Sequence, residues 1–260
     1  MKVIDEGKHK IHILVTSYQN MNSSYMVWQY EPDKIVPVSI CSYLILGKEP
    51  VLVDTSYDSN DMPSLRKAGL DIMTKPEWDL VTQIKGLGVE PEDIKYIVLT
   101  HLHMDHIGNL ECFPNAKIIL QRKELMYAAS PLHPDGMPLG FKRVFYRGKD
   151  VANFVTALWR RLIVIDGEYE VIPGIRCVWF GGHTPGTQAV YVKTAVGNAI
   201  ITGDICPFFL NFETGGYMTG IYMNWDEVVL AQRRMIAEGD ILIPCHDPEI
   251  QKRFPTQVIG

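Results

Sequence analysis

The sequence predicts an α/β fold in which two packed sheets are covered by helices. Apolar runs of strand length cluster early and again late in the 260 residues, and helical patterns lie between them. Apolar residues make up 47% of the chain, enough for a large buried core, while charged residues stay at an ordinary 21%. Four of the apolar runs also end at a histidine or an aspartate, so one edge of a sheet is expected to carry polar side chains.

Each predicted strand is a short run rich in Ile, Val and Leu, whereas each predicted helix has the wider spacing of a single apolar face. Asn224 precedes the last helix and supplies the side chain of an N-cap. No linker, low-complexity tract or repeat interrupts the chain, so we expect a single domain over residues 1–260. The strands are expected at residues 11–15, 37–46, 50–53, 96–100, 117–120, 162–165, 175–180, 188–192, 199–203 and 241–245, and the helices at residues 78–85, 122–129 and 226–238.

One stretch, at about residues 130–161, does not fit this core pattern. It is long, irregular and rich in proline, which is typical of a lid or a binding loop. We predict a lid-like insertion that forms a wall of the substrate site, with a dimer interface or a packed aromatic cluster as the alternative. Residues 21–28 hold Met and aromatic side chains that either line a pocket or pack. The aromatic residues of the longer stretch are Phe141, Phe145, Tyr146, Phe154 and Trp159.

Residues 101–106 read His-Leu-His-Met-Asp-His and begin where an apolar run stops. Three imidazoles and a carboxylate within six positions are hard to explain as packing, and they are the ligands that zinc and other first-row metals accept. Three further apolar runs end at His183, Asp204 and His246. Because strand ends on one edge of a sheet can meet, the sequence predicts a metal site built from all of these residues.

The composition argues against several kinds of partner. The net charge is −5 and no run of Lys or Arg stands out, so a nucleic-acid partner is not expected. No stretch approaches the roughly 18 apolar residues of a membrane span, and residues 1–7 lack the apolar region of a secretory signal. The five cysteines are scattered and form no Cys-x-x-Cys pair, which predicts reduced thiols in a cytoplasmic protein.

The pattern His-x-His-x-Asp-His, followed at a distance by His183, Asp204 and His246, resembles the metallo-β-lactamase superfamily. The resemblance covers most of the chain, because residues 37–46 and 51–55 look like the opening strands of that family. It implies a four-layer αβ/βα sandwich, the metallo-β-lactamase fold. In such relatives the residue matching Asp54 ends a strand beside the metal centre and supports it.

The resemblance also implies which side chains hold metal. Two divalent ions are expected, each with three ligands of its own and one ligand shared between them. The first ion takes His101, His103 and His183, the second takes Asp105, His106 and His246, and Asp204 is the bridge.

Zinc is the first choice for these ions, and iron, manganese and cobalt suit the same ligands. Two such ions roughly 4 Å apart acidify a bridging water to hydroxide, polarise a carbonyl and stabilise the leaving oxygen. As a ligand, Asp105 is expected close to that hydroxide, so we predict that it is the catalytic proton shuttle. Because histidine ligands must be neutral, activity should fall below about pH 6.

Within the superfamily, the sequence is most similar to quorum-quenching N-acyl homoserine lactonases and related lactonases. The long leader before His101 and its opening strands carry this similarity, since glyoxalase II-like thioesterases place the motif nearer the N-terminus. His103 stands where flavodiiron proteins usually carry Glu. The export signal of secreted β-lactamases and the basic surface of the nuclease branch are not visible.

The predicted function is therefore hydrolysis of an ester bond in a lactone, either an N-acyl homoserine lactone or a related cyclic ester. Such lactonases commonly carry tyrosine three residues after the bridging aspartate, whereas this chain has Pro207, and Tyr217 or Tyr222 are the nearby candidates to replace that tyrosine. The alternatives are a glyoxalase II-like thioester hydrolase, an ester or amide hydrolase, and a non-catalytic metal-binding protein on the same fold. Relatives are often dimeric, so a homodimer stays open.

Overall fold

A computed structural model describes residues 7–130, 145–213 and 216–260, and its strands form two sheets. The smaller sheet has the order β12 (Ile241–Ile243), β11 (Gly197–Ile201), β10 (Gln188–Thr194), β9 (Ile175–Trp179) and β8 (Tyr169–Ile172). The larger sheet has the order β13 (Val258–Ile259), β1 (Lys10–Asn22), β2 (Ile35–Leu46), β3 (Val51–Val53), β5 (Tyr96–Val98), β6 (Lys117–Gln121) and β7 (Leu162–Ile165), with β4 (Ile72–Met73) paired to β1.

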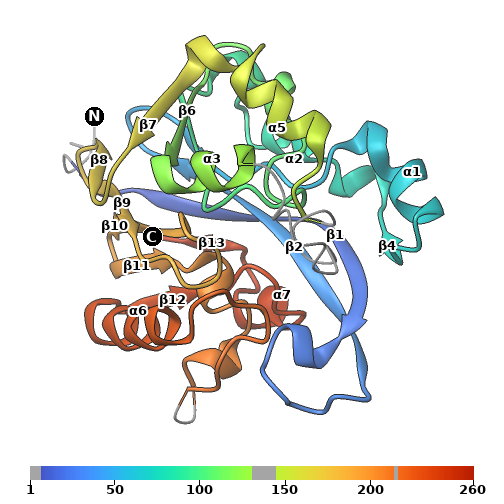
Figure 1. Ribbon diagram of the computed structural model, residues 1–260. Helices are drawn as coiled ribbons and strands as arrows, with labels where there is room; N and C mark the ends of the chain where they lie inside the picture. Colours follow the sequence, from blue (N-terminus) through green and yellow to red (C-terminus); the bar gives the residue numbers. More distant parts are fainter. Residues whose placement is uncertain (1–6, 131–144, 214–215) are drawn as a thin grey trace.

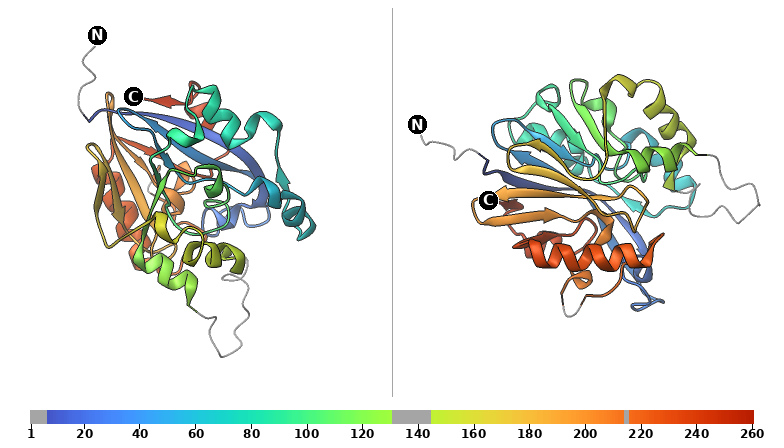
Figure 2. Two further views of the ribbon diagram at one scale, coloured as in Figure 1. Left: turned by 90° about the horizontal axis from the view of Figure 1, so that it is seen from above. Right: turned by 60° about the vertical axis from the view of Figure 1, so that its left-hand side comes forward.

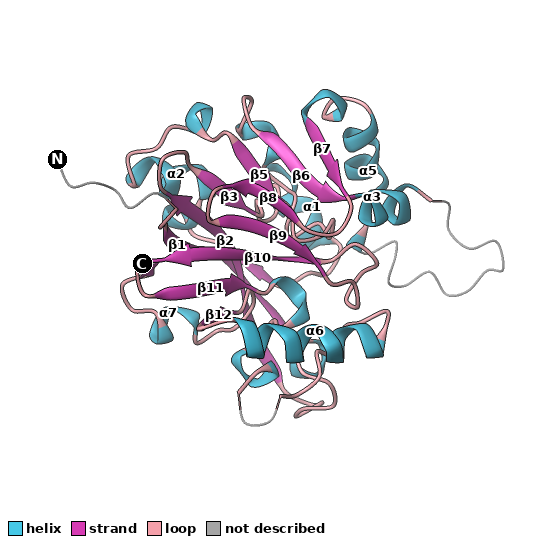
Figure 3. Ribbon diagram, turned by 90° about the vertical axis from the view of Figure 1, so that its left-hand side faces the viewer, coloured by secondary structure: helices cyan, strands magenta, loops and turns pink. Residues whose placement is uncertain are grey.

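Helices lie on the outer face of each sheet (Figure 1). Side chains of α2 (Leu80–Gly86), α3 (Arg122–Ala129) and α5 (Gly148–Val155) pack on the larger sheet, and those of α6 (Trp225–Glu238) pack on the smaller one. Figures 2 and 3 show the strands between these two helical layers. The shorter helices α1 (Met62–Lys67) and α7 (Ile250–Arg253) complete the described part.

The core follows the two-residue period of β-strands. In β10, Val190 belongs to the cluster between the sheets and Tyr191 to the cluster beneath α6. In β2, Tyr43 faces the cluster between the sheets and Leu44 faces the helices on the other side. Since both faces of each sheet are buried, the central strands read as nearly continuous apolar runs.

The predicted αβ/βα sandwich is confirmed. Every predicted strand and helix is found, although the ends are shifted. Strand β1 continues to Asn22, well beyond the predicted 11–15, because it pairs with β2 along its whole length. Helix α6 begins at Trp225, one residue early, where the Asn224 side chain accepts a hydrogen bond from Glu227 N at 3.2 Å. The short elements β4, β8, β13, α1, α5 and α7 were not predicted.

The prediction of an irregular stretch at residues 130–161 is wrong in its second half. Helix α5 occupies Gly148–Val155 and buries Phe154, and a 3₁₀ turn covers Trp159–Arg161. A helix of this length is not stable by itself, and the packing of Phe154 on neighbouring elements stabilises it. Phe141 lies outside the described residues, and the lid-like role of the stretch stays a prediction.

The described residues contain no helix that is long and apolar enough to cross a bilayer. All five cysteines are free thiols, and four of them are buried. A free, buried cysteine packs as a small apolar residue, so most of these thiols need no role beyond the core.

Candidate metal centre

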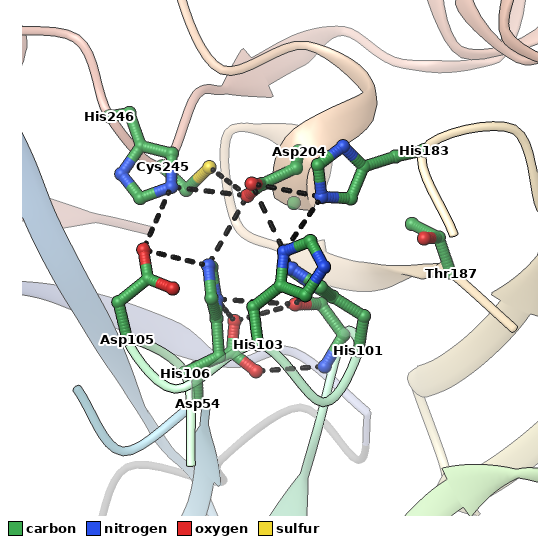
Figure 4. A network of polar contacts seen from close by, with 12 residues as sticks. Asp54, His101, His103, Asp105, His106, His183, Thr187, Asp204, Cys245 and His246 are labelled. Atoms are coloured by element: carbon green, nitrogen blue, oxygen red, sulfur yellow. Dashed lines mark hydrogen bonds and ion pairs between the residues drawn. The ribbon is translucent and has the colours of Figure 1, made fainter. Parts of the chain in front are cut away.

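The seven predicted ligands lie where strands end, at one edge of the sandwich. Four of them are in the loop after β5, while His183 follows β9, Asp204 lies in a turn after β11, and His246 follows β12. Strand β5 runs parallel to β3 and β6, and β11 runs parallel to β12, so the carboxyl ends of each set share an edge. The structure brings all seven side chains together (Figure 4).

Asp204 lies at the centre and turns one oxygen toward each half of the cluster. Its Oδ2 is 3.2 Å from His183 Nε2 and 3.8 Å from His101 Nε2. Its Oδ1 is 3.2 Å from His246 Nε2 and 3.3 Å from His106 Nε2. One carboxylate therefore reaches both halves, which is what a bridging ligand must do.

The remaining two side chains complete the halves. His103 Nδ1 lies 3.2 Å from His183 Nε2, and Asp105 Oδ2 lies 3.5 Å from His106 Nε2 and 3.7 Å from His246 Nε2. These groupings match those that the sequence predicts, and the role of the residues as ligands stays a prediction. Within each group the ligand atoms lie within 4.8 Å of one another. The groups are His101, His103, His183 and Asp204, then Asp105, His106 and His246, and a third group that joins Asp204 and His246 to Cys245.

The chemistry of the cluster fits a pair of divalent cations. The Nε2 atoms of His101 and His106 are buried and make no hydrogen bond to any described residue. A buried polar nitrogen in that position costs free energy unless it meets a partner, and a metal ion is one. Five imidazoles and two carboxylates form the donor set that zinc and neighbouring metals favour.

Backbone carbonyls orient two of the histidines. His183 Nδ1–H donates to Ile221 O at 2.8 Å, and His246 Nδ1–H donates to Ser39 O at 2.7 Å. Each bond fixes the ring and its tautomer, so the lone pair on Nε2 points into the cluster. Gly182 is required beside His183, because its φ is +83° and a Cβ there would lie 2.6 Å from Val228 Cγ2.

Asp54, which lies directly after β3, orients two further histidines, His106 directly and His101 through Thr100. Its φ of +56° is left-handed, a conformation that aspartate tolerates better than most residues. Its Oδ2 accepts from His106 Nδ1–H at 2.8 Å and from the Thr100 hydroxyl at 2.7 Å, and its Oδ1 accepts from Thr100 N at 2.8 Å. The Thr100 oxygen can then accept from His101 Nδ1–H at 3.1 Å. Asp54 thus supports the centre as the resemblance implies.

Burial and neighbouring charges determine the protonation of the first ligand group, which contains His101, His103 and Asp204. Burial, reinforced by neighbouring imidazoles, lowers the pKa of His101 and His103 well below the usual value, so both rings are neutral and able to bind metal. For Asp204, burial acts to raise the pKa, but the surrounding histidines outweigh it and hold the pKa well below its usual range. The central group is therefore a carboxylate.

In the second ligand group, nearby carboxylates determine the pKa values of His106 and His246. Burial acts to lower the pKa of His106, but Asp105, Asp204 and Asp54 outweigh it and raise that pKa to about 10. Burial likewise opposes the pKa rise of His246, which the Asp204 carboxylate drives. This half of the cluster strongly favours positive charge, which either a proton or a divalent ion supplies.

Sequence reasoning missed a buried carboxylate that joins the ligand loops. Glu124 on α3 is fully buried. Its Oε1 accepts from Leu102 N, inside the motif, at 2.9 Å and from the Tyr146 hydroxyl at 2.7 Å. Its Oε2 accepts from Thr184 Oγ1 at 2.7 Å and from Gly186 N at 3.0 Å, and both residues lie in the loop that follows His183. A glutamate in a helical pattern normally faces solvent, so nothing in the sequence distinguished this one.

Cys245 also has a role that was not predicted. Its thiol donates to Asp204 Oδ1 at 3.1 Å. Burial and then the Asp204 carboxylate raise the pKa of Cys245 well above its usual value, so the sulfur keeps its proton and the hydrogen bond. Cys245 therefore does more than fill space in the core, because its hydrogen-bond partner is the central carboxylate.

A cavity of about 310 Å³ opens onto the cluster, and most of its wall is apolar. From residues 21–28, Met21, Tyr25 and Met26 line the cavity. The stretch at 130–161 contributes Phe145, whose ring stacks on His103 at 4.7 Å. The described lining residues are Gln19, Met21, Tyr25, Met26, Val38, Ile40, Tyr57, Leu70, His103, Met104, Asp105, Phe145, His183, Asp204, Ile221 and His246.

Neither tyrosine considered as a replacement at position 207 lines this cavity. Tyr217 packs edge-on against Tyr30 at 5.6 Å and is 43% exposed. Tyr222 packs against Trp225 at 5.4 Å. Tyr57 lines the cavity instead, and its role was not predicted because its position depends on the turn after β3.

Known proteins resemble the chain in sequence and in fold. A sequence model of the metallo-beta-lactamase superfamily matches residues 36–235. The N-acyl homoserine lactonase of Bacillus thuringiensis is 31% identical over 194 residues, which are 70% of either protein. A solved N-acyl homoserine lactone hydrolase, with N-hexanoyl-L-homoserine bound at its catalytic metal centre, has a TM-score of 0.77 and 25% identity over 95% of this chain and 96% of that one.

A more distant structure, the dizinc quorum-quenching lactonase AidC, shares the fold at a TM-score of 0.69 and 17% identity, over 93% of this chain and 88% of that one. The sequence match spans more than two thirds of the Bacillus enzyme and includes the motif region. The predicted family and branch are thereby confirmed. The chain belongs to the metallo-β-lactamase superfamily, in its N-acyl homoserine lactonase-like branch.

Proposed function

We propose that this protein is a metal-dependent hydrolase that opens a lactone, either an N-acyl homoserine lactone or a related cyclic ester. One observation carries the proposal: the two ligand groups lie in the wall of an otherwise apolar cavity. A lactone with an apolar tail has a carbonyl for the metal centre and a chain for the apolar wall. The activity of the related Bacillus lactonase supports the same substrate class.

Seven residues hold the metal ions, and one of them, Asp105, also transfers the proton. When bound, two divalent ions, with zinc as the first choice, activate a water at neutral pH and polarise the carbonyl under attack. Asp105 accepts the proton released by the attack and returns it to the ring oxygen as the ester bond breaks. We assign one ion to His101, His103 and His183, the other to Asp105, His106 and His246, and Asp204 to both.

A hydrolysis screen tests this function. Proton release is followed across N-acyl homoserine lactones, simple lactones, aryl esters and thioesters with the zinc-loaded protein. We expect turnover of lactones above all others. Thioester turnover in preference to every lactone would establish the glyoxalase II-like alternative, and metal binding without hydrolysis of any substrate would establish a non-catalytic protein on this fold. A cytoplasmic location and a homodimer stay predictions.

Metal affinity should rise with pH, because the pKa values of His106 and His246 are raised. His106, with its pKa raised to about 10, holds a proton below that pH, and coordination requires its loss. Zinc binding therefore releases protons, and the apparent affinity should rise by about tenfold per pH unit for each proton displaced between about pH 7 and 9. Competition with a chromophoric chelator, corrected for the chelator's own protonation, measures this slope. An affinity that is flat over this range would contradict the assignment of His106 as a ligand.

A further inference from the structure

Gln19 is an unusual side chain for an apolar cavity. It is only 9% exposed, lines the cavity, and is the one carboxamide among the described lining residues. Its Oε1 accepts a hydrogen bond from the Tyr57 hydroxyl at 2.6 Å. Its Nε2 makes no hydrogen bond to any residue that the structure describes. The Nε2 atom is not fully enclosed by protein, so its two N–H donors are open to the cavity that the side chain lines.

The position of Gln19 is rigid. It lies in β1 where that strand pairs with β2 on one side and with β4 on the other, opposite Val38 and Ile72. The Tyr57 ring is fixed as well, because it packs in a buried cluster with Ile40 and Met104. A donor on paired strands, with its carbonyl end already held, is oriented before any ligand arrives.

When a ligand fills the cavity, the amide donors of Gln19 lose their contact with water, and this loss costs free energy unless the ligand supplies an acceptor. Gln19 lines the same cavity as Asp105, Asp204 and His246, so a molecule that extends from the ligand groups and fills the cavity can contact it. A strand position facing an apolar space is normally filled by an apolar residue. The amide at this position therefore indicates that the natural ligand carries a polar acceptor beside its apolar part.

We propose that Gln19, oriented by Tyr57, donates a hydrogen bond to the amide carbonyl of an N-acyl lactone and so selects amide-bearing lactones over alkyl lactones. The inference rests on the proposed lactone hydrolysis. The lactone carbonyl goes to the metal centre, and the acyl amide, one bond from the ring, goes to Gln19.

The test compares two substrates on four variants. The substrates are N-hexanoyl homoserine lactone and an α-alkyl-γ-butyrolactone of matched length without the amide. The variants are Gln19→Met and Tyr57→Phe, with Gln251→Met and Tyr18→Phe as matched controls. The control pair also forms a tyrosine–glutamine hydrogen bond, at 3.2 Å, but neither residue lines the cavity.

We expect Gln19→Met to lower kcat/KM for the amide lactone by about tenfold more than for the alkyl lactone, because only the first loses a hydrogen bond. Tyr57→Phe should shift the same ratio in the same direction by a smaller factor, and neither control should shift it. Equal losses on both substrates would overturn the inference and leave the proposed function standing. A wild-type protein that hydrolyses neither lactone would overturn the proposed function and this inference with it.

Discussion

Replacing Asp105 by asparagine is expected to lower kcat for lactone hydrolysis by about 10²–10⁴-fold, the usual effect of removing a general acid–base group. The Asp105 carboxylate lies 3.5 Å from His106 Nε2, within the second ligand group, and its side chain is 15% exposed toward the cavity. An amide cannot accept the proton released by the attack, and it binds a metal less strongly. The measurement is kcat at saturating lactone, with the metal content determined on the same sample.

A surface substitution of the same kind separates this effect from a general loss of charge. Asp166 pairs with Arg122 at 2.9 Å, and both side chains are mostly exposed. Asp166→Asn should leave kcat within about twofold, because exposed ion pairs contribute little. If Asp105→Asn kept full turnover, Asp105 would not be the proton shuttle.

Replacing Glu124 by alanine should have the largest effect on stability, a loss of about 3–5 kcal/mol in the free energy of unfolding. The substitution removes the acceptor of four donors, of which the Thr184 hydroxyl keeps a contact with Thr187 Oγ1 at 2.6 Å. Each buried donor that is left unpaired costs about 1–3 kcal/mol when the site cannot relax. These donors are the backbone N–H groups of Leu102 and Gly186 and the hydroxyls of Tyr146 and Thr184. Urea unfolding of the metal-free protein measures the loss.

The same variant should also bind zinc more weakly, since Glu124 ties the loop of residues 101–106 to the loop after His183. Glu90→Ala is the control, because the Glu90 side chain is exposed and its ion pair with Lys85, at 3.2 Å, lies at the surface. That control should cost less than about 1 kcal/mol. A Glu124→Ala protein as stable as the control would show that its neighbours find other acceptors.

The sequence was sufficient for the features that are local in the chain. The sandwich could be inferred because its central strands are buried on both faces and read as continuous apolar runs. The ligand groups could be inferred because His101, His183, Asp204 and His246 each follow such a run within a few residues. Residue type, spacing and the nearby strand end were enough to predict that these side chains lie at one edge of the sandwich.

The supporting residues were not predictable in the same way. Glu124, Cys245 and Gln19 each sit inside an ordinary helix, strand end or strand, and their partners are far away in sequence. Their importance depends on which elements pack side by side, which a hydrophobic pattern does not specify. Short elements such as β4 and β13 were missed for a related reason, because two residues show no period and form only by pairing with β1.

The central claim is that a pair of metal ions held by these seven residues hydrolyses a lactone. The most direct measurement is a titration of chelator-treated protein with zinc, with hydrolysis of N-hexanoyl homoserine lactone followed by proton release in the same sample. The account predicts no turnover without metal and a rate that saturates near about two equivalents of zinc. Full turnover in the metal-free protein, or at well below one equivalent, would contradict it.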